Sequence, residues 1–243
     1  MNRFIRSLKT GFSLMKYSLA FKMNMALMLV FGGLGIAYEV ITVFSNMASE
    51  GVSHGISNYN GIWMLAMSPL YAIQMMYGVS LSGIAQSSDS KRLLLVDSAT
   101  AFKAIWEIVC FAIIALTRYI CFRNADLNKG DILFGLLFFG LFSLVISLYT
   151  VIIYRYTTVG YVVMLPLIIL FMLVPLFMNR SNLSFSPVSL MSRLPFGESY
   201  PVCLAIAAGI VIIDIVLFYA LSVAMYKVPL SEKAFRQLLS RAK

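Results

Sequence analysis

The sequence predicts an all-α integral membrane protein with six transmembrane helices, and three observations support this. The chain of 243 residues is 60% hydrophobic and only 12% charged, with a mean hydropathy of +0.88. A soluble domain of this size could not hide so much apolar surface from water. The apolar residues gather into six runs, each close to the ~20 residues that a helix needs to cross the hydrocarbon core. The Lys and Arg residues fall mainly at the ends of these runs, as membrane topology requires.

The predicted spans follow one another closely along the chain. They cover roughly residues 24–46, 61–85, 101–121, 132–154, 159–178 and 202–226. Only RYTT separates the fourth from the fifth, which predicts a tight hairpin. The domain organisation is therefore an N-terminal element over 1–22, a transmembrane domain over 23–226 and a basic cytoplasmic tail over 227–243. We expect no cleavable signal peptide, because the first element is too polar for one.

The distribution of Lys and Arg predicts that both termini are cytoplasmic. If the N-terminus is placed inside, 14 of the 19 basic residues lie on the inner side and five on the outer side. The inner set includes Lys103 and Arg155, and the outer set includes Arg118. The positive-inside rule favours this orientation, and an even number of spans agrees with it.

Residues 1–22 predict an amphipathic helix that lies in the membrane interface. The apolar residues of one face recur at helical spacing, and they are Phe4, Leu8, Phe12, Met15 and Leu19. The opposite face carries Arg3, Arg6, Lys9, Ser13 and Lys16. Such a helix is either a simple anchor or a brace for the cytoplasmic ends of the spans.

A structured insert separates the second and third predicted spans. Residues 87–104 read SSDSKRLLLVDSATAFKA. Ser88 or Ser90 can cap a short helix, and Asp97 or Ser98 can cap the next, which runs into the third span. The first helix, over about 87–96, offers leucines and charges to a soluble partner. The alternative is a helix that only lies on the membrane surface.

Three carboxylates lie within the predicted spans. Glu39 lies just past the middle of the first span, Glu107 in the inner third of the third, and Asp214 near the midplane of the last. Each is costly in lipid, so each is a candidate functional residue. Glu107 could also snorkel or pair with a nearby Lys. The alternative for all three is a structural hydrogen bond to a neighbouring helix or subunit.

Two further features concern packing and the outer surface. The small-residue runs FGGLG (31–35) and AIAAG (205–209) predict close helix packing, within the chain or across a dimer interface. Prolines punctuate the outer segment 179–201, so it is either re-entrant or folded on the surface.

The sequence lacks the parts of an enzyme. It contains no G-x-x-x-x-G-K-[ST] segment and therefore no P-loop of its own. With His54 as the single histidine, no Ser–His–Asp set or metal cluster can be assembled. Cys110, Cys121 and Cys203 lack metal-type spacing and are predicted to be small core residues. The net charge of +9 lies at the ends of spans, which argues against a nucleic-acid partner.

The architecture resembles that of the type-2 ABC exporter permeases, the membrane subunits that work with a separate ATPase. The resemblance covers nearly the whole chain and rests on the basic N-terminal helix, the six spans, the structured first cytoplasmic loop, the short second loop and the Pro-broken outer segment. The stretch SGIAQSSDSKRLLLVDSATAFKAI (82–105) is similar to that family's loop through its first coupling helix. The outer SPVSLMSRLP is similar to its short re-entrant helices. A finer likeness is to small bacterial permeases that export amphipathic toxins or antimicrobial peptides.

This resemblance implies a mechanism and a set of site residues. Two permease chains, identical or related, would pair in a bacterial cell membrane, and each would bind a cytoplasmic ATPase subunit that holds ATP and Mg. The implied coupling residues are Asp89, Lys91, Arg92, Leu93 and Leu94. The candidate residues of the substrate path, or intramembrane polar residues, are Tyr38, Glu39, Met64, Met67, Tyr71, Met75, Glu107 and Asp214.

The expected function is thus ATP-driven export of an amphipathic substrate, a peptide or toxin being favoured. The chain itself is expected to hold no cofactor and to be no enzyme, with membrane lipid and the ATPase as partners. Two alternatives stay open. One is an ion- or proton-coupled carrier that uses the three carboxylates, and the other is a non-transporting membrane subunit for immunity or assembly.

Overall fold

The computed structural model describes residues 2–18, 21–48, 57–80, 92–124, 129–153, 155–178 and 199–228. All regular structure in these ranges is helical, as predicted. The helices in chain order are α1 (Asn2–Met15), α2 (Phe21–Ala48), α3 (Ser57–Ser80), η1 (Leu93–Ser98), α5 (Ala99–Asn124), α6 (Lys129–Ile153), α7 (Thr157–Val159), η2 (Gly160–Met164), α8 (Leu165–Met178) and α10 (Tyr200–Met225).

Four segments of the described chain are long and apolar enough to cross a membrane. They are Phe21–Phe44, Leu95–Arg123, Ile132–Ile153 and Tyr200–Met225. These segments match the first, third, fourth and sixth predicted spans, so the helical membrane class is confirmed at that level. The second predicted span corresponds to α3, which is long but is not among these four segments. Within the fifth, the apolar helix Gly160–Phe171 is shorter than the other four.

The position of α3 explains its mixed composition. It contains Pro69 and Gln74, yet its core side chains, such as Ile62, Leu65 and Ile73, are at most 1% exposed. Helices α2, α5 and α6 all pack against it. A helix that protein covers on most sides need not be apolar all round, because few of its side chains meet lipid. The polar and proline residues of α3 therefore fit its place at the centre of the bundle.

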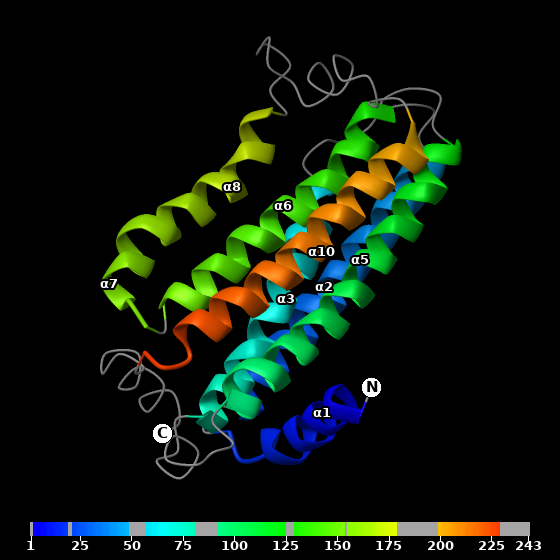
Figure 1. Cartoon of the computed structure of the whole chain (residues 1–243). Coiled ribbons are helices and arrows are strands. Elements are labelled where there is room, and N and C mark those ends of the chain that lie inside the picture. Colours follow the sequence, from blue (N-terminus) through cyan, green and yellow to red (C-terminus); the bar gives the residue numbers. More distant parts are fainter. Residues whose placement is uncertain are drawn as a thin grey trace.

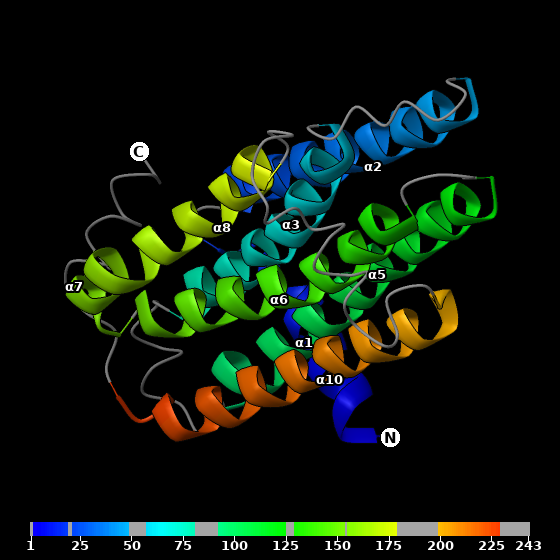
Figure 2. The same ribbon diagram turned by 90° about the horizontal axis from the view of Figure 1, so that it is seen from above.

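The long helices run alternately along one bundle (Figure 1). Helix α2 leaves the end at which α1 lies, α3 returns to it, and the alternation continues through α5, α6, α8 and α10. Helix α1 lies across that end, where η1 begins and α10 finishes. The view from above shows α8 at one edge of the bundle, on the far side of α6 from α5 and α10 (Figure 2).

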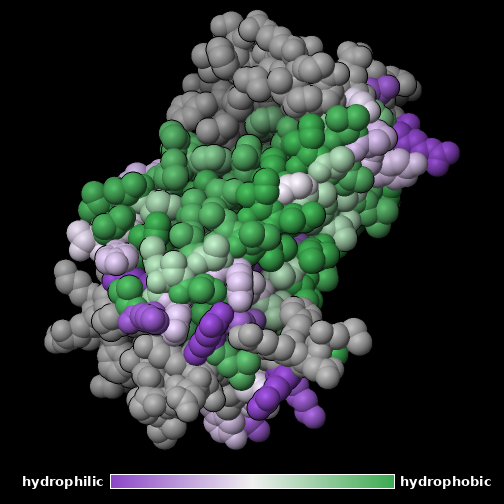
Figure 3. Space-filling view, viewed as in Figure 1, coloured by the Kyte–Doolittle hydropathy of each residue, from purple (hydrophilic) through white to green (hydrophobic). Residues whose placement is uncertain are grey.

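The surface of the bundle carries an apolar band. Figure 3 shows this band across the middle of one face, with hydrophilic residues towards the end at which α1 lies. The exposed apolar side chains of the bundle include Leu29 on α2, Ile108 on α5 and Val216 on α10, each more than half exposed. Large apolar side chains in such numbers on a surface are what a bilayer solvates and water does not.

Glycines let α2 and α3 approach closely, as the small-residue pattern predicts. A Cβ atom on Gly35 would lie 2.7 Å from Leu65 Cγ, and one on Gly61 would lie 2.7 Å from Glu39 Oε1. Gly33 has no neighbour within 4 Å of such an atom. Gly35 of the FGGLG run therefore packs against α3 of the same chain. In the second run, Ala207 is fully buried, and its carbonyl oxygen lies 3.5 Å from a Cβ placed on Gly140 of α6.

The N-terminal amphipathic helix is shorter than the predicted element, because it ends at Met15. Met15 is buried and Leu8 half-buried, while Arg6, Lys9 and Lys16 are exposed, as the helical pattern predicts. Phe12 contacts Phe102 of α5, with ring centroids 4.4 Å apart. Side chains of Phe4 and Leu19 lie outside the described part. Helix α1 thus packs against the bundle and is not a detached anchor.

The insert before α5 has no break between two helices at Asp97 or Ser98, where the sequence predicted one. Arg92 already has helical dihedral angles (φ −62°, ψ −44°), and the chain stays helical through η1 into α5. Asp97 and Ser98 therefore lie inside a helix and do not cap a new one. The continuation runs through the π-helical turns of η1. Residues 81–91, 179–198 and 229–243, with most of the predicted coupling helix, outer segment and tail, lie outside the described residues.

Candidate functional site

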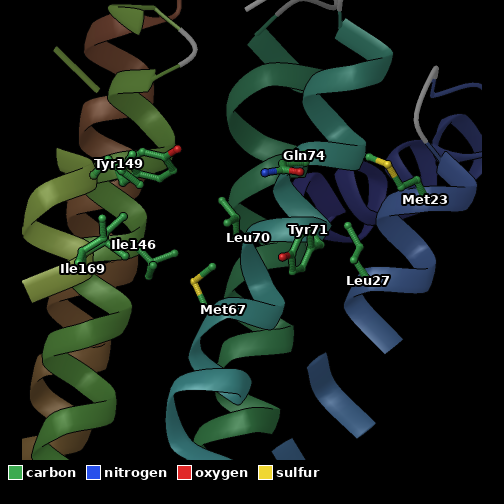
Figure 4. A pocket seen from close by; sticks show the side chains of 11 residues that line it. Met23, Leu27, Met67, Leu70, Tyr71, Gln74, Ile146, Tyr149 and Ile169 are labelled. Atoms are coloured by element: carbon green, nitrogen blue, oxygen red, sulfur yellow. The ribbon is translucent and has the colours of Figure 1, made fainter. Parts of the chain in front are cut away.

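A cleft of ≈ 470 Å³ opens between α2 and α3 on one side and α6 and α8 on the other. The residues that line it are Met23, Leu27, Met67, Leu70, Tyr71, Gln74, Ile146, Tyr149, Leu165, Ile168 and Ile169. The lining is apolar except for one amide and two phenols. Figure 4 shows the two walls, with Tyr149 directed across the gap towards the helix that carries Gln74.

Helical spacing places these side chains in the cleft. On α3, Met67, Leu70, Tyr71 and Gln74 follow an i, i+3, i+4, i+7 pattern, so they share one face. On the opposite wall, Leu165, Ile168 and Ile169 repeat the same spacing at the start of α8. An apolar wall with a few polar groups suits an amphipathic molecule, which needs apolar contact along its body and a polar partner at one point.

Glu39 does not open into this cleft. Its Oε1 accepts a hydrogen bond from Arg118 Nη2 at 2.8 Å, and its Oε2 accepts one from the Thr117 hydroxyl, also at 2.8 Å. Glu39 is fully buried, and Arg118 is only 1% exposed. This pair joins α2 to α5 and balances one negative charge with one positive charge. Burial without such a partner would cost far more than the pair does.

Glu107 and Asp214 meet in a second buried cluster around Lys103. The Lys103 Nζ donates to Glu107 Oε2 one turn along α5 and to Asp214 Oδ2 on α10 at 2.8 Å. From α6, the Ser143 hydroxyl donates to Glu107 Oε1 at 2.7 Å, and Ser147 Oγ lies 3.1 Å from Asp214 Oδ2. The cluster ties α5, α6 and α10 together. It holds two carboxylates to one ammonium group, so it differs from the balanced Glu39–Arg118 pair.

These contacts correct the reading of two basic residues. The topology count placed Lys103 on the inner side and Arg118 on the outer side, but both are buried in α5 and pair with carboxylates. When these two residues are left out, each side of the count loses one basic residue, and the excess of Lys and Arg on the inner side is unchanged. The i, i+4 spacing of Lys103 and Glu107 was the available signal. No signal in the sequence predicted the pairing of Arg118 with Glu39, because the two residues lie 79 positions apart.

The predicted substrate-path residues separate into three environments. Met67 and Tyr71 line the cleft. The carboxylates Glu39, Glu107 and Asp214 lie in the ionic clusters.

The remaining three residues of that set do not line the cleft. Met75 is fully buried in the core, while Tyr38 and Met64 are half-buried on α2 and α3. Sequence reasoning missed Gln74 and Tyr149, although the spacing of Gln74 from Met67 and Tyr71 could have found it.

The predicted coupling residues are described only in part. Asp89 and Lys91 lie outside the described residues, and nothing is described of the Leu94 side chain. Arg92 is exposed and Leu93 half-buried at the start of η1. This turn contacts α1, so the exposed Arg92 lies at the same end of the bundle as the basic face of that helix.

The cysteines match their prediction. Cys110, Cys121 and Cys203 are free and buried. Among the described residues, no group of three or more His, Cys, Asp or Glu side chains is placed to hold a metal ion.

Comparison with known proteins gave no match to any family model, curated protein or solved structure.

Proposed function

We propose that the chain is the transmembrane permease subunit of an ATP-driven exporter that moves an amphipathic substrate, with ATP hydrolysis supplied by a separate ATPase. The cleft between α3 and the α6–α8 wall carries this proposal, because it offers apolar walls with Tyr71, Gln74 and Tyr149 as polar points. A peptide or toxin with an apolar face fits this chemistry better than a small polar solute does.

The proposed topology adds α3 and the α7–η2–α8 helix to the four apolar helices, which gives six crossings with both termini in the cytoplasm. The alternating direction of the helices supports it. So does the gathering of α1, the start of η1 and the end of α10 at one end of the bundle. The excess of Lys and Arg at that end is the reason to place it in the cytoplasm.

The proposed ATPase contact is the surface around Arg92 at this cytoplasmic end. Arg92 is exposed beside the α1–η1 contact, so a cytoplasmic protein bound there would push on α5 and α1 together. Because α5 carries both ionic clusters, force applied at its start reaches α2, α6 and α10 through buried contacts.

Co-purification with an ATPase tests the proposal. The detergent-solubilised chain should retain an ABC-type ATPase, including one encoded beside it. Arg92→Glu should abolish retention, whereas Arg123→Glu should not, since Arg123 is also exposed but lies at the far end of α5. Failure of the unaltered chain to retain any ATPase would refute the exporter proposal.

The ion-coupled alternative has narrower support. Glu39 is already neutralised by Arg118, so a coupling role would fall on Glu107 and Asp214. Transport that survives replacement of both by their amides would exclude that role. The non-transporting alternative predicts protection against a peptide toxin that persists when ATP hydrolysis is lost.

A further inference from the structure

A second hollow, separate from the cleft, lies where α1 meets the bundle. This groove of ≈ 290 Å³ is bounded by the end of α1, the first turns of α2, Ala72 of α3 and the start of α5. Its lining is almost wholly apolar, and Lys16 is the one charged residue in it. Met23 and Leu27 of α2 face the cleft, whereas Met25 and Met28 face the groove. The two hollows therefore lie on different faces of α2.

The groove follows the two helices away from α1. Along α2 its wall is formed by Phe21, Met25 and Met28, and along α5 by Phe102, Ile105 and Trp106. The Phe12–Phe102 ring contact marks the end at α1. The far end is marked by Trp106, whose Cζ2 lies 3.4 Å from a Cβ placed on Gly32. The groove is therefore lined by apolar side chains of α2 and α5 and has Lys16 at the α1 end.

The charge at its mouth is positive. Lys16 is exposed, and its Nζ lies 5.0 Å from the ring centre of Tyr17. Lys9 and Lys22 are exposed on the same part of the chain. No carboxylate is among the residues that line the groove. A Lys whose stem lies along an apolar slot and whose ammonium group reaches the interface is suited to hold an anionic lipid headgroup.

We propose that this groove binds one acyl chain of an anionic phospholipid, with the headgroup phosphate at Lys16. The apolar slot takes the chain, because its Met, Phe and Trp side chains adapt to flexible hydrocarbon. The lipid then fills the space between α1, α2 and α5 and fixes the amphipathic helix to the bundle. The site is independent of the exporter proposal and requires only that the bundle lies in a membrane.

Tryptophan quenching tests the site, because Trp106 lines the groove and Trp63 is the one other tryptophan of the chain. The Trp63→Phe chain is reconstituted in phosphatidylcholine vesicles that contain a small share of phosphatidylglycerol, with bromine on the acyl chains of one lipid at a time. Brominated phosphatidylglycerol should quench Trp106 with about fivefold higher apparent affinity than brominated phosphatidylcholine, which is the effect of one Lys on an anionic lipid.

Matched variants distinguish a specific lipid-binding site from ordinary contact with the surrounding lipid. Lys16→Gln should remove the preference for phosphatidylglycerol, and Lys9→Gln should leave it, because Lys9 is exposed on α1 but does not line the groove. Equal quenching by both lipids in the parent chain would overturn the proposal. So would equal losses in the two Lys variants, or no quenching by either lipid.

A second measurement covers the case in which Trp63→Phe does not fold. Native mass spectrometry of the unaltered chain in detergent should show one retained phosphatidylglycerol in preference to phosphatidylcholine. Lys16→Gln should lose it. Retention of both lipids alike would contradict the site.

Discussion

Glu39 and Arg118 form a buried one-to-one ion pair, and its energetics predict an unequal response to single and double substitutions. Arg118→Met alone should destabilise the folded chain by about 3–5 kcal/mol, because it leaves an uncompensated buried carboxylate. Glu39→Gln should also destabilise, because it leaves the guanidinium without a counter-charge. The double variant should recover a large part of the loss. Thermal unfolding in detergent, arranged as a double-mutant cycle, measures the coupling.

Strictly additive losses in that cycle would contradict the pairing. A like-for-like control is Arg123→Met, which removes an exposed arginine of the same helix. Its effect should stay within about 0.5 kcal/mol, as for other exposed sites.

The Lys103 cluster predicts a different order of effects. Lys103→Met should destabilise more than Asp214→Asn, because it leaves Glu107 and Asp214 without the cation that both contact. Asp214→Asn leaves a balanced Lys103–Glu107 pair. The midpoint of thermal unfolding should therefore fall further for Lys103→Met. The reverse order would mean that the ammonium group does not neutralise both carboxylates.

At the scale of single residues, the sequence could identify the carboxylates that are costly to bury in an apolar helix, but not all of the residues that pair with them. Glu39, Glu107 and Asp214 were visible because a carboxylate in an apolar run is rare. Lys103 is next to Glu107 on the helix, so their contact could be anticipated. Asp214 lies 111 positions from Lys103. Such contacts depend on which helix faces come together, and hydropathy does not specify that.

At the scale of the helix, the close approach of α2 and α3 predicts opposite results for two Gly→Ala changes. Gly61→Ala should destabilise by about 1–3 kcal/mol, because the added Cβ would lie 2.7 Å from Glu39 Oε1 and 3.0 Å from the Gly35 carbonyl oxygen. Gly33→Ala adds an atom with no neighbour within 4 Å. It should be neutral or stabilise by up to ~1 kcal/mol through helix propensity. Thermal unfolding of the two variants in one detergent provides the comparison, and equal effects would contradict the packing.

The helices could be predicted from the sequence where a long apolar stretch is enough to identify them. Helices α2, α5, α6 and α10 match predicted spans because each carries a long apolar stretch. Helix α3 contains Pro69 and Gln74 at the centre of the bundle. The sequence also predicted a break before α5, because Asp97 and Ser98 resemble helix caps, but the chain is already helical there. A π-helical stretch absorbs them without a break. A residue type that suits a helix cap therefore does not by itself mark the start of a helix.

At the scale of the whole molecule, the bundle has two parts. One part is held together by the two ionic clusters, and the other is the α8 wall of the cleft, which has fewer packing contacts. Contacts among α2, α3, α5, α6 and α10 are reinforced by buried charge and hydrogen bonds. Outside its own helix, α8 packs mainly on α6. The α8 wall can therefore move with the least loss of packing, and its movement would widen or narrow the cleft.

Thiol labelling at Gln74 tests most directly whether this cleft is a wet path for an amphipathic substrate. The native cysteines are buried and serve as an unreactive background. In vesicles, Gln74→Cys should react quickly with N-ethylmaleimide, because water in the cleft allows the thiolate to form. Met75→Cys, buried in the core, and Val216→Cys, exposed on the apolar surface of α10, should react slowly. A long-chain alkyl-ammonium amphiphile should protect Gln74→Cys. Reaction of Gln74→Cys as slow as that of Val216→Cys, or rapid reaction without protection, would contradict a substrate cleft at this position.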